Sequence, residues 1–222
     1  MLEKKIDFSA VVFDMDGTLL DSMGYWMNAG AAYVSSLGMT PEENLGEKLF
    51  SMTMAEGIQY LAEHYAIAKS EREILDGIEA VLADAYRSVI LLKDGARDFL
   101  EALSARNIPM TIATNTDRSL FEPALERLGI ARYMKRIFTC TECGKSKFHP
   151  DIFFQAAEFL GSAPSETLVA EDALYAIRTA HSAGFKTLGL YDASSREDSL
   201  HIRSYSTLYC QSLVEAKKAL FG

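Results

Sequence analysis

The feature of the sequence that most constrains the fold is an alternation of short apolar runs with helical patterns. Runs typical of β-strands occur at residues 6–13, 110–113, 136–139, 168–170, 187–191 and around 207–210. Helical patterns fill the gaps after residue 94, and each would carry the chain back to start another strand in the same direction. The alternation therefore predicts an α/β protein built on a parallel sheet.

Proline and glycine residues mark the ends of several predicted helices. Pro123 is expected to open a helix that Gly129 closes. Pro150 and Asp151 are expected to open another, which Gly161 closes. Proline is favoured in the first turn of a helix because its missing N–H group loses no hydrogen bond there, and glycine readily adopts the left-handed conformation that ends many helices.

The segment 21–93 interrupts the alternation, because its apolar residues recur at helical spacing, as in 58–65 and 74–85. Its helices could pack directly on the sheet or form a separate cap. Its placement favours a cap, since it leaves the sheet after the first strand and returns near residue 94, where a lid could exclude water. We expect a core domain of residues 1–20 and 94–222 and a helical cap domain of residues 21–93.

Charge and cysteine content limit the partners and the location. The formal net charge of −9 and the pI near 5.0 argue against binding to a nucleic-acid backbone. The three cysteines are an odd number in a chain without a signal peptide or a long apolar span, which favours a cytoplasmic protein with no membrane partner. Cys140 and Cys143 are interpreted as ordinary thiols, because no second pair accompanies them. We expect a monomer or a weak dimer.

Two acidic residues follow the first predicted strand. Asp14 and Asp16 stand where the apolar run ends, and Gly17 lets the chain turn sharply out of the sheet. An Asp-x-Asp pair is often only a solvated turn. In this position, however, the two carboxylates would repel each other, and a bound cation or a shared proton would relieve the repulsion. Mg²⁺ prefers oxygen ligands and often binds together with a phosphate, so the pair is a candidate Mg²⁺ and phosphate site.

Further polar residues follow other predicted strands, at the sheet edge where open α/β sheets bind their ligands. Thr114 and Asn115 end one strand with a hydroxyl group, an amide and backbone N–H donors. They could form a turn or hold a phosphate oxygen. Glu171 and Asp172 end another strand just before a helical pattern, where they could either favour the helix dipole or bind a metal ion.

These segments, taken in order, resemble the four motifs of the haloacid dehalogenase superfamily of phosphohydrolases. Asp14 to Leu20 resembles the first motif, Thr114 the second, and Glu171 with Asp172 the fourth.

The third motif is a lysine followed by Pro-x-Pro-Asp-x-Phe. Lys147 matches it, with Pro150, Asp151 and Phe153 in register, while Phe148 replaces the first proline. Lys145 is the alternative lysine.

The resemblance implies a Rossmann-like parallel core and a mechanism. Asp14 would attack phosphorus and form an aspartyl-phosphate, and Asp16 would act as the general acid and base. Lys147 would neutralise Asp14 and the transferring phosphoryl group. The implied phosphate ligands are Met15 and Asn115 through their N–H groups, Thr114 and Lys147. The implied Mg²⁺ ligands are Asp14, the backbone carbonyl of Asp16, Asp172 and, directly or through water, Glu171.

The small helical insertion looks like the phosphoglycolate phosphatase and β-phosphoglucomutase branch, so the implied activity is hydrolysis of a small phosphorylated metabolite such as a sugar phosphate or phosphoglycolate. Asp16 argues against the dehalogenases and phosphonate hydrolases of the superfamily, which lack an acid there. Lys48 is interpreted as a solvated helix lysine rather than the Schiff-base lysine of the phosphonate hydrolases.

A sugar phosphomutase remains an alternative, although residues 49–54 lack the arginine that grips the second phosphate in the mutase. A non-catalytic protein that binds phosphate for regulation is the alternative of another class. Tyr25, Trp26 and Asn28 could contact the leaving group, but packing within the helices is the safer interpretation of the aromatic residues.

Overall fold

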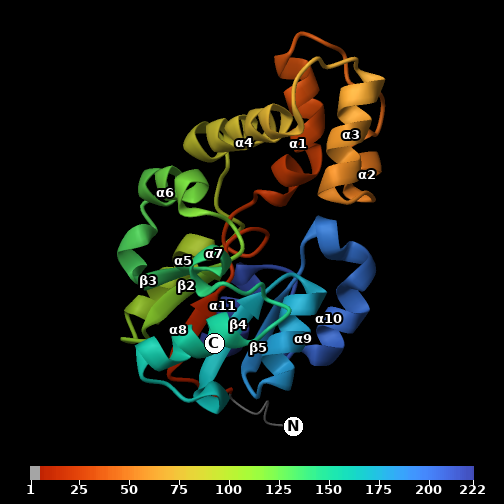
Figure 1. Ribbon diagram of the computed structural model, residues 1–222. Coiled ribbons are helices and arrows are strands. Elements are labelled where there is room, and N and C mark those ends of the chain that lie inside the picture. The colour runs from red at the N-terminus through yellow and green to blue at the C-terminus, as the bar shows by residue number, and fades with distance from the viewer. Residues whose placement is uncertain (1–5) are drawn as a thin grey trace.

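A six-stranded parallel sheet forms the centre of the protein, in the order β3-β2-β1-β4-β5-β6 (Figure 1). The computed structural model describes residues 6–222, apart from the side chain of Phe50. The strands are β1 (Ala10–Phe13), β2 (Met110–Thr114), β3 (Met134–Thr139), β4 (Thr167–Glu171), β5 (Lys186–Leu190) and β6 (Leu208–Cys210). This arrangement confirms the predicted Rossmann-like α/β fold. The first five residues of the predicted core lie outside the described residues.

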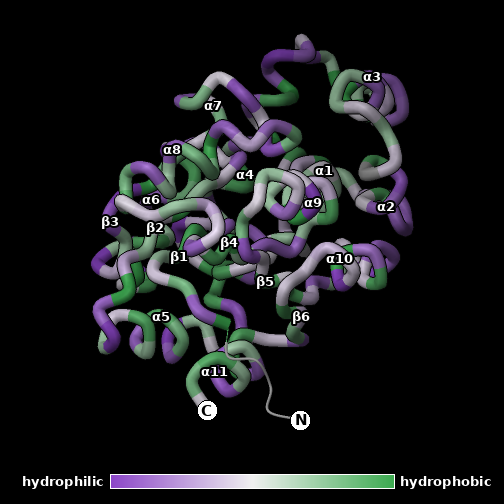
Figure 2. Tube along the Cα trace, turned by 90° about the horizontal axis from the view of Figure 1, so that it is seen from below, coloured by the Kyte–Doolittle hydropathy of each residue, from purple (hydrophilic) through white to green (hydrophobic). Residues whose placement is uncertain are grey.

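Helices cover both faces of the sheet, which Figure 2 shows between α5 and α11 on one side and α8 and α9 on the other. The helices that follow residue 94 are α5 (Ala96–Ser104), α6 (Arg118–Arg127), α7 (Cys140–Cys143), α8 (Asp151–Leu160), α9 (Leu174–Ser182), α10 (Ser199–Tyr205) and α11 (Leu213–Phe221). Short 3₁₀ helices are η1 (Ala131–Tyr133), η2 (Pro164–Glu166) and η3 (Ala193–Asp198).

The central strands are buried on both faces, because side chains alternate across a strand. In β1, Val11 and Phe13 belong to the apolar cluster that contains residues of α5, α6 and α11. Val12, between them, belongs to the opposite cluster, with residues of α8 and α9. Because neither face of these strands reaches solvent, the strands offer polar groups to a ligand only at their ends.

Four helices in the segment 21–93 pack around an apolar cluster of their own. They are α1 (Met23–Ser36), α2 (Leu45–Phe50), α3 (Met54–His64) and α4 (Glu71–Ser88). Capping boxes begin two of them: Thr53 and Glu56 at α3, and Ser70 and Glu73 at α4. Figure 1 shows these helices beyond the end of the sheet where β1 ends.

Two short connecting segments join the four helices to the sheet, and they run side by side. Leu20 pairs with Leu92 in an antiparallel bridge. The N–H of Asp21 donates to the carbonyl of Leu91 at 2.9 Å, and the N–H of Lys93 donates to the carbonyl of Leu19 at 2.9 Å. The helical segment therefore departs from the core and returns to it at one place.

The structure corrects two details of the prediction. The first strand is shorter than the predicted run 6–13 and begins at Ala10. Pro123 was expected to open a helix, but it lies inside α6, which begins at Arg118. A proline here removes one hydrogen bond within the helix. Burial of Phe121 and other apolar residues of α6 against the core favours the helix despite that loss. Gly129 follows the helix with φ +66°, as expected.

Candidate active site

The strand register brings the acidic residues of two separate motifs together. Phe13 of β1 pairs with Ala170 of β4, so the next residues, Asp14 and Glu171, lie side by side at the carboxyl ends of the two strands. The N–H of Asp14 donates to the carbonyl of Ala170 at 2.9 Å and fixes this position. Asp172 follows directly. One carboxylate oxygen from each of the three acids lies within 4.8 Å of the others, and all three residues are buried.

Gly17 allows the turn after β1 to pass close to this cluster. Its φ of +87° lies in the left-handed region, which glycine adopts without strain. A Cβ atom at this position would meet the carboxylate of Asp172. The expected role of Gly17 in the turn is thus explained both by its conformation and by the space that the acid occupies.

Lys147 places a positive charge among the acids. Its side chain is 1% exposed, and its Nζ donates to Asp14 and, at 2.7 Å, to Glu171. Lys145, the alternative considered from the sequence, is 53% exposed and pairs instead with Asp151 at 2.6 Å. The structure therefore brings Lys147, and not Lys145, to the predicted cluster.

Burial and mutual repulsion control the protonation of these groups. Burial alone would lower the pKa of Lys147, but the carboxylates of Asp14 and Glu171 outweigh it and raise this pKa. Burial raises the pKa of Glu171 against the opposing effect of Lys147. Burial, followed by the charge of Asp14, raises the pKa of Asp172 well above its ordinary value. The cluster holds more negative charge than one lysine can neutralise, and a bound cation would stabilise it.

The donor set suits Mg²⁺, which prefers carboxylate and carbonyl oxygens. Among the residues that the structure describes, the Oδ2 atom of Asp14 is buried and has no hydrogen-bond partner. A buried oxygen without a partner destabilises the folded protein, and a bound cation would remove this cost. Asp14, Glu171 and Asp172 therefore fit a hard divalent metal ion.

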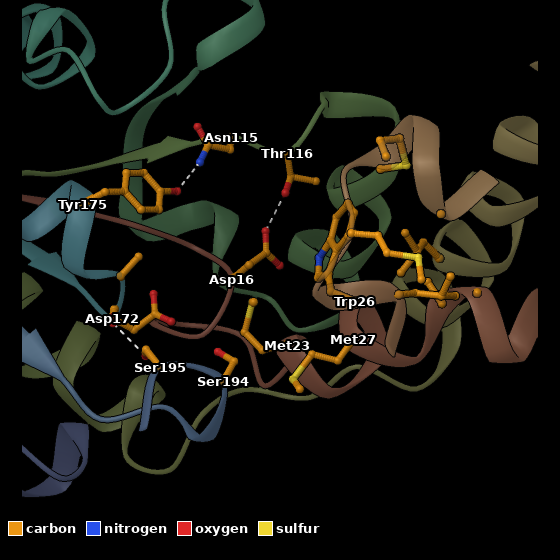
Figure 3. Close-up of a pocket in the computed structure, with 18 of the residues that line it drawn as sticks. Asp16, Met23, Trp26, Met27, Asn115, Thr116, Asp172, Tyr175, Ser194 and Ser195 are labelled. Carbon is orange, nitrogen blue, oxygen red and sulfur yellow. Dashed lines mark hydrogen bonds between the residues drawn. The ribbon is translucent and has the colours of Figure 1, made fainter. Parts of the chain in front are cut away.

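Asp16 is separate from this cluster and is held by three hydroxyl groups. Ser22 donates to its Oδ1 at 2.6 Å, and Thr116 donates to its Oδ2 at 2.7 Å, as Figure 3 shows for the second contact. The third donor is the hydroxyl of Tyr86 in α4. This hydroxyl also accepts a hydrogen bond from Nε1 of Trp26 in α1 at 2.9 Å. The helical segment therefore reaches the second acid of the first motif directly.

The environment of Asp16 favours its protonated form more than water does. Burial, followed by the charge of Asp14, raises the pKa of Asp16, although the three hydroxyl donors partly oppose the shift. A carboxyl group with a raised pKa is suited to donate a proton and later to accept one. Asp14, in contrast, accepts a charge-assisted hydrogen bond from the ammonium group of Lys147.

The remaining predicted phosphate ligands lie around the same strand ends, but with different exposure. Thr114 is buried, and its Oγ1 accepts a hydrogen bond from the N–H of Thr116 at 3.0 Å. Met15 is buried next to Asp14. Asn115 is exposed, and its side-chain amide donates to the hydroxyl of Tyr175 at 2.7 Å. The ring of Tyr175 stacks on Phe148, the residue that replaces the motif proline, with centroids 4.6 Å apart.

A cavity of about 880 Å³ opens beside these residues, between the strand ends and the four helices. Asp14, Asp16, Glu171 and Asp172 line one end of it. Met23, Trp26 and Met27 of α1 line another part, and Figure 3 shows Trp26 and Met27 on the far side of Asp16 from Asp172. The cavity thus connects the acidic cluster with the interior surface of the helical segment.

Sequence reasoning did not find the hydroxyl donors to Asp16. Thr116 directly follows Thr114 and Asn115, the predicted phosphate ligands, but the motif gives Thr116 itself no role. Tyr86 is 70 positions away from Asp16 and lies in a helical pattern, where an aromatic residue usually indicates packing. For Trp26, the sequence is compatible both with packing and with contact to the leaving group. No spacing rule links these residues, because their contact depends on how α1 and α4 pack.

Comparison with known proteins identifies the family. Over residues 11–190 the sequence matches the haloacid dehalogenase-like hydrolases, and the chain belongs to that family. A phosphoglycolate phosphatase of Shigella boydii serotype 4 is 28% identical over 243 residues, covering 99% of this chain and 95% of that protein. A phosphorylated carbohydrates phosphatase of Thermotoga maritima is 25% identical over 179 residues, covering 81% of this chain and 83% of that protein.

A solved structure supports the same fold. It is of a Thermotoga maritima protein classed with the β-phosphoglucomutases, and it matches with a TM-score of 0.85 at 22% identity, covering 96% of this chain and 100% of that chain. The resemblance inferred from the four motifs is confirmed, and the similar proteins include both groups named for the branch. In the part of the chain that the structure describes, no helix combines the length and apolar character needed to cross a membrane.

Proposed function

We propose that the protein is a Mg²⁺-dependent phosphatase that hydrolyses a small phosphorylated metabolite through a phosphorylated Asp14. The observation that carries the proposal is the buried grouping of Asp14, Lys147, Glu171 and Asp172 at the ends of two neighbouring strands, with Asp16 facing the same cavity. Family membership and the phosphatases among the similar proteins support it.

In the proposed reaction, a carboxylate oxygen of Asp14 forms a bond to phosphorus while the bond from phosphorus to the substrate alcohol breaks. Asp16 gives its proton to the departing alcohol oxygen. Asp16 then takes a proton from water, whose oxygen attacks phosphorus and releases phosphate and the free Asp14 carboxylate. The raised pKa of Asp16 and its hydroxyl donors support this role, because the first step requires the protonated acid.

We propose that the surrounding residues offset the negative charges of Asp14 and of the substrate phosphate. Lys147 would reduce the repulsion between Asp14 and the phosphate group, and Thr114 with the N–H groups of Met15 and Asn115 would hold phosphate oxygens. Asp14, Asp172, the backbone carbonyl of Asp16 and Glu171, directly or through water, would hold Mg²⁺. When bound, the ion would supply positive charge that lets two anions approach each other.

We further propose that residues 21–93 form a cap domain over a core of residues 1–20 and 94–222. The separate apolar cluster and the paired connecting segments support a unit that can move as one body. A cap that closes over Asp14 would exclude water until the phosphoryl group has been transferred.

The test is release of inorganic phosphate from p-nitrophenyl phosphate with and without Mg²⁺, comparing the wild type with Asp14→Asn. We expect turnover that needs Mg²⁺ and that is abolished in the variant. Equal behaviour of the two proteins would instead favour the alternative of a non-catalytic phosphate-binding protein. A panel of phosphorylated metabolites would then rank the substrates.

A sugar phosphomutase is the second candidate, because a protein classed with the β-phosphoglucomutases shares the fold. Isomers of glucose 1-phosphate with a bisphosphate activator distinguish the two. Isomerisation without release of phosphate would replace our proposal by the mutase. The cytoplasmic location, the lack of a nucleic-acid partner and the monomeric or weakly dimeric state stay predictions.

A further inference from the structure

The wall that the helical segment contributes to the cavity is apolar. Its lining residues include the methionines Met23, Met27, Met52 and Met54, together with Trp26 and Leu49. The wall as a whole is formed by α1, α2, the turn before α3, α3 and α4. Among the described residues of this segment, none with a charged side chain lines the cavity.

The two polar groups on this wall are already engaged. The hydroxyl of Thr53 lies 2.8 Å from a carboxylate oxygen of Glu56, to which it donates, and it also accepts the N–H of that residue at 3.3 Å. The indole N–H of Trp26 donates to Tyr86 at 2.9 Å. A substrate hydroxyl group placed against this wall would exchange hydrogen bonds with water for contacts with methyl and methylene groups, which is unfavourable.

From this wall and its continuity with Asp14 and Asp16, we propose that the substrate is a phosphate monoester of an alcohol that carries a bulky hydrocarbon group, and not of a sugar. The inference rests on the proposed function, because it assigns the leaving group of that same reaction. The phosphate would occupy the end lined by Asp14, Thr114 and Asp172, and the hydrocarbon group would lie against the α1, α2 and α3 wall.

The size and the chemistry of the cavity agree with this class of substrate. A volume of about 880 Å³ lies in the range of cavities that enclose ligands much larger than a two-carbon acid. Four methionines line the wall, and their flexible thioethers adapt to the shape of an apolar group. The ring of Trp26 is held in one orientation by its hydrogen bond to Tyr86, and it offers a flat apolar surface next to Asp16.

A second anionic group on the substrate would find little support in this wall. Of the lysine and arginine residues that the structure describes, Arg178 lines the cavity, and it is an exposed residue of α9 in the core. A bisphosphate would therefore have to place its distal phosphate toward α9 and leave the methionine surface uncovered. The hydrocarbon ester uses that surface, because burying apolar area is the favourable contribution available there.

The experiment compares esters with the same type of leaving oxygen. 2-Cyclohexylethyl phosphate, glycerol 3-phosphate and glucose 6-phosphate are all primary alkyl phosphates, so intrinsic bond cleavage differs little among them. With Mg²⁺ present, we expect kcat/KM for the cyclohexyl ester to exceed that for either polyol ester by about 10-fold or more. A preference for a polyol ester, or no preference, would overturn the inference while leaving the proposed phosphatase intact.

Matched variants connect the preference to the wall. Leu49→Gln, in α2, should lower the ratio of kcat/KM between the cyclohexyl ester and glycerol 3-phosphate by about 10-fold. Leu200→Gln makes the same exchange at a residue that is 79% exposed and outside the cavity, and it should leave the ratio unchanged. Met52→Gln serves as a second variant of the wall if Leu49→Gln does not fold.

If the ratio of kcat/KM between the two esters stayed unchanged in both wall variants, the hydrocarbon group would bind elsewhere and the inference would be wrong. Absence of turnover with every ester, p-nitrophenyl phosphate included, would overturn the proposed function and this inference together.

Discussion

The two sides of the cavity differ in what holds them and in what they offer a ligand. On the core side, charged and polar groups stand at the ends of strands, and the register fixes their positions to one another. On the side of the helical segment the surface is apolar, and the hydroxyls of Ser22 and Tyr86 reach Asp16 of the core. In our proposals, the residues at the strand ends carry out the reaction and the helices select the leaving group.

The largest effect is expected when the positive charge is removed from the core side. Lys147→Met should reduce phosphate release by about 10²- to 10³-fold, because the phosphoryl group would then approach Asp14 without its cationic neighbour. It should also lower the free energy of unfolding by about 3 kcal/mol, since Asp14 and Glu171 would be left as buried acids without their partner. Turnover of p-nitrophenyl phosphate and denaturant unfolding measure the two effects.

Lys145→Met is the matched control, because Lys145 lies two residues earlier and pairs with Asp151 while 53% exposed. An exposed ion pair contributes little, so we expect activity within about twofold of the wild type. A loss in Lys145→Met as large as that in Lys147→Met would contradict the assignment of the core side.

A smaller effect tests a polar contact between the two sides, that of Tyr86 with Asp16. Tyr86→Phe keeps the ring but removes the hydroxyl that donates to Asp16 and accepts from Trp26. We expect kcat for an alkyl phosphate to fall by about 10-fold, because a hydrogen bond to a carboxyl group positions the proton donor. The loss should be smaller for p-nitrophenyl phosphate, whose leaving group needs little protonation.

Tyr33→Phe provides the control within the same four helices. Tyr33 is also buried, but in the part of the chain that the structure describes its hydroxyl has no hydrogen-bond partner. This variant should leave both activities unchanged. If Tyr86→Phe slowed both esters equally, the hydroxyl would have a structural role, and the helices would contribute packing alone.

The smallest expected effect concerns how independently the two regions fold. Ser70 caps α4 in the helical segment, and Ser212 caps α11 in the core, each by accepting the N–H of the residue three positions later. Replacing either serine by alanine should lower the free energy of unfolding by about 1 kcal/mol. Tyr86 and Ile90 belong to the core's apolar cluster, so both variants should shift one common transition. Two transitions in calorimetry would instead show separate unfolding.

The sequence predicted the core side of the molecule much better than the helical side. The ends of β1, β2 and β4 could be located because apolar runs stop at polar residues, and parallel strands end at the same edge. Helical spacing in the segment 21–93 showed that helices exist, but spacing does not determine which face meets the sheet. Hence the motif predicts Lys147, whereas the contact of Tyr86 with Asp16 and the methionines on the cavity wall depend on how the helices pack. At Pro123 the core prediction was wrong. The proline predicted the start of a helix, but burial of neighbouring apolar residues stabilises a helix that begins at Arg118.

The antiparallel bridge between Leu20 and Leu92 has a consequence for evolutionary change in this architecture. The chain leaves the sheet and returns to it at this bridge. The four helices between Leu20 and Leu92 are therefore, in topological terms, one very long hairpin loop. Lengthening, shortening or exchanging that loop would leave the strand order and the acidic cluster untouched. Evolutionary replacement of this loop could therefore change which substrates bind while the residues at the strand ends stay the same.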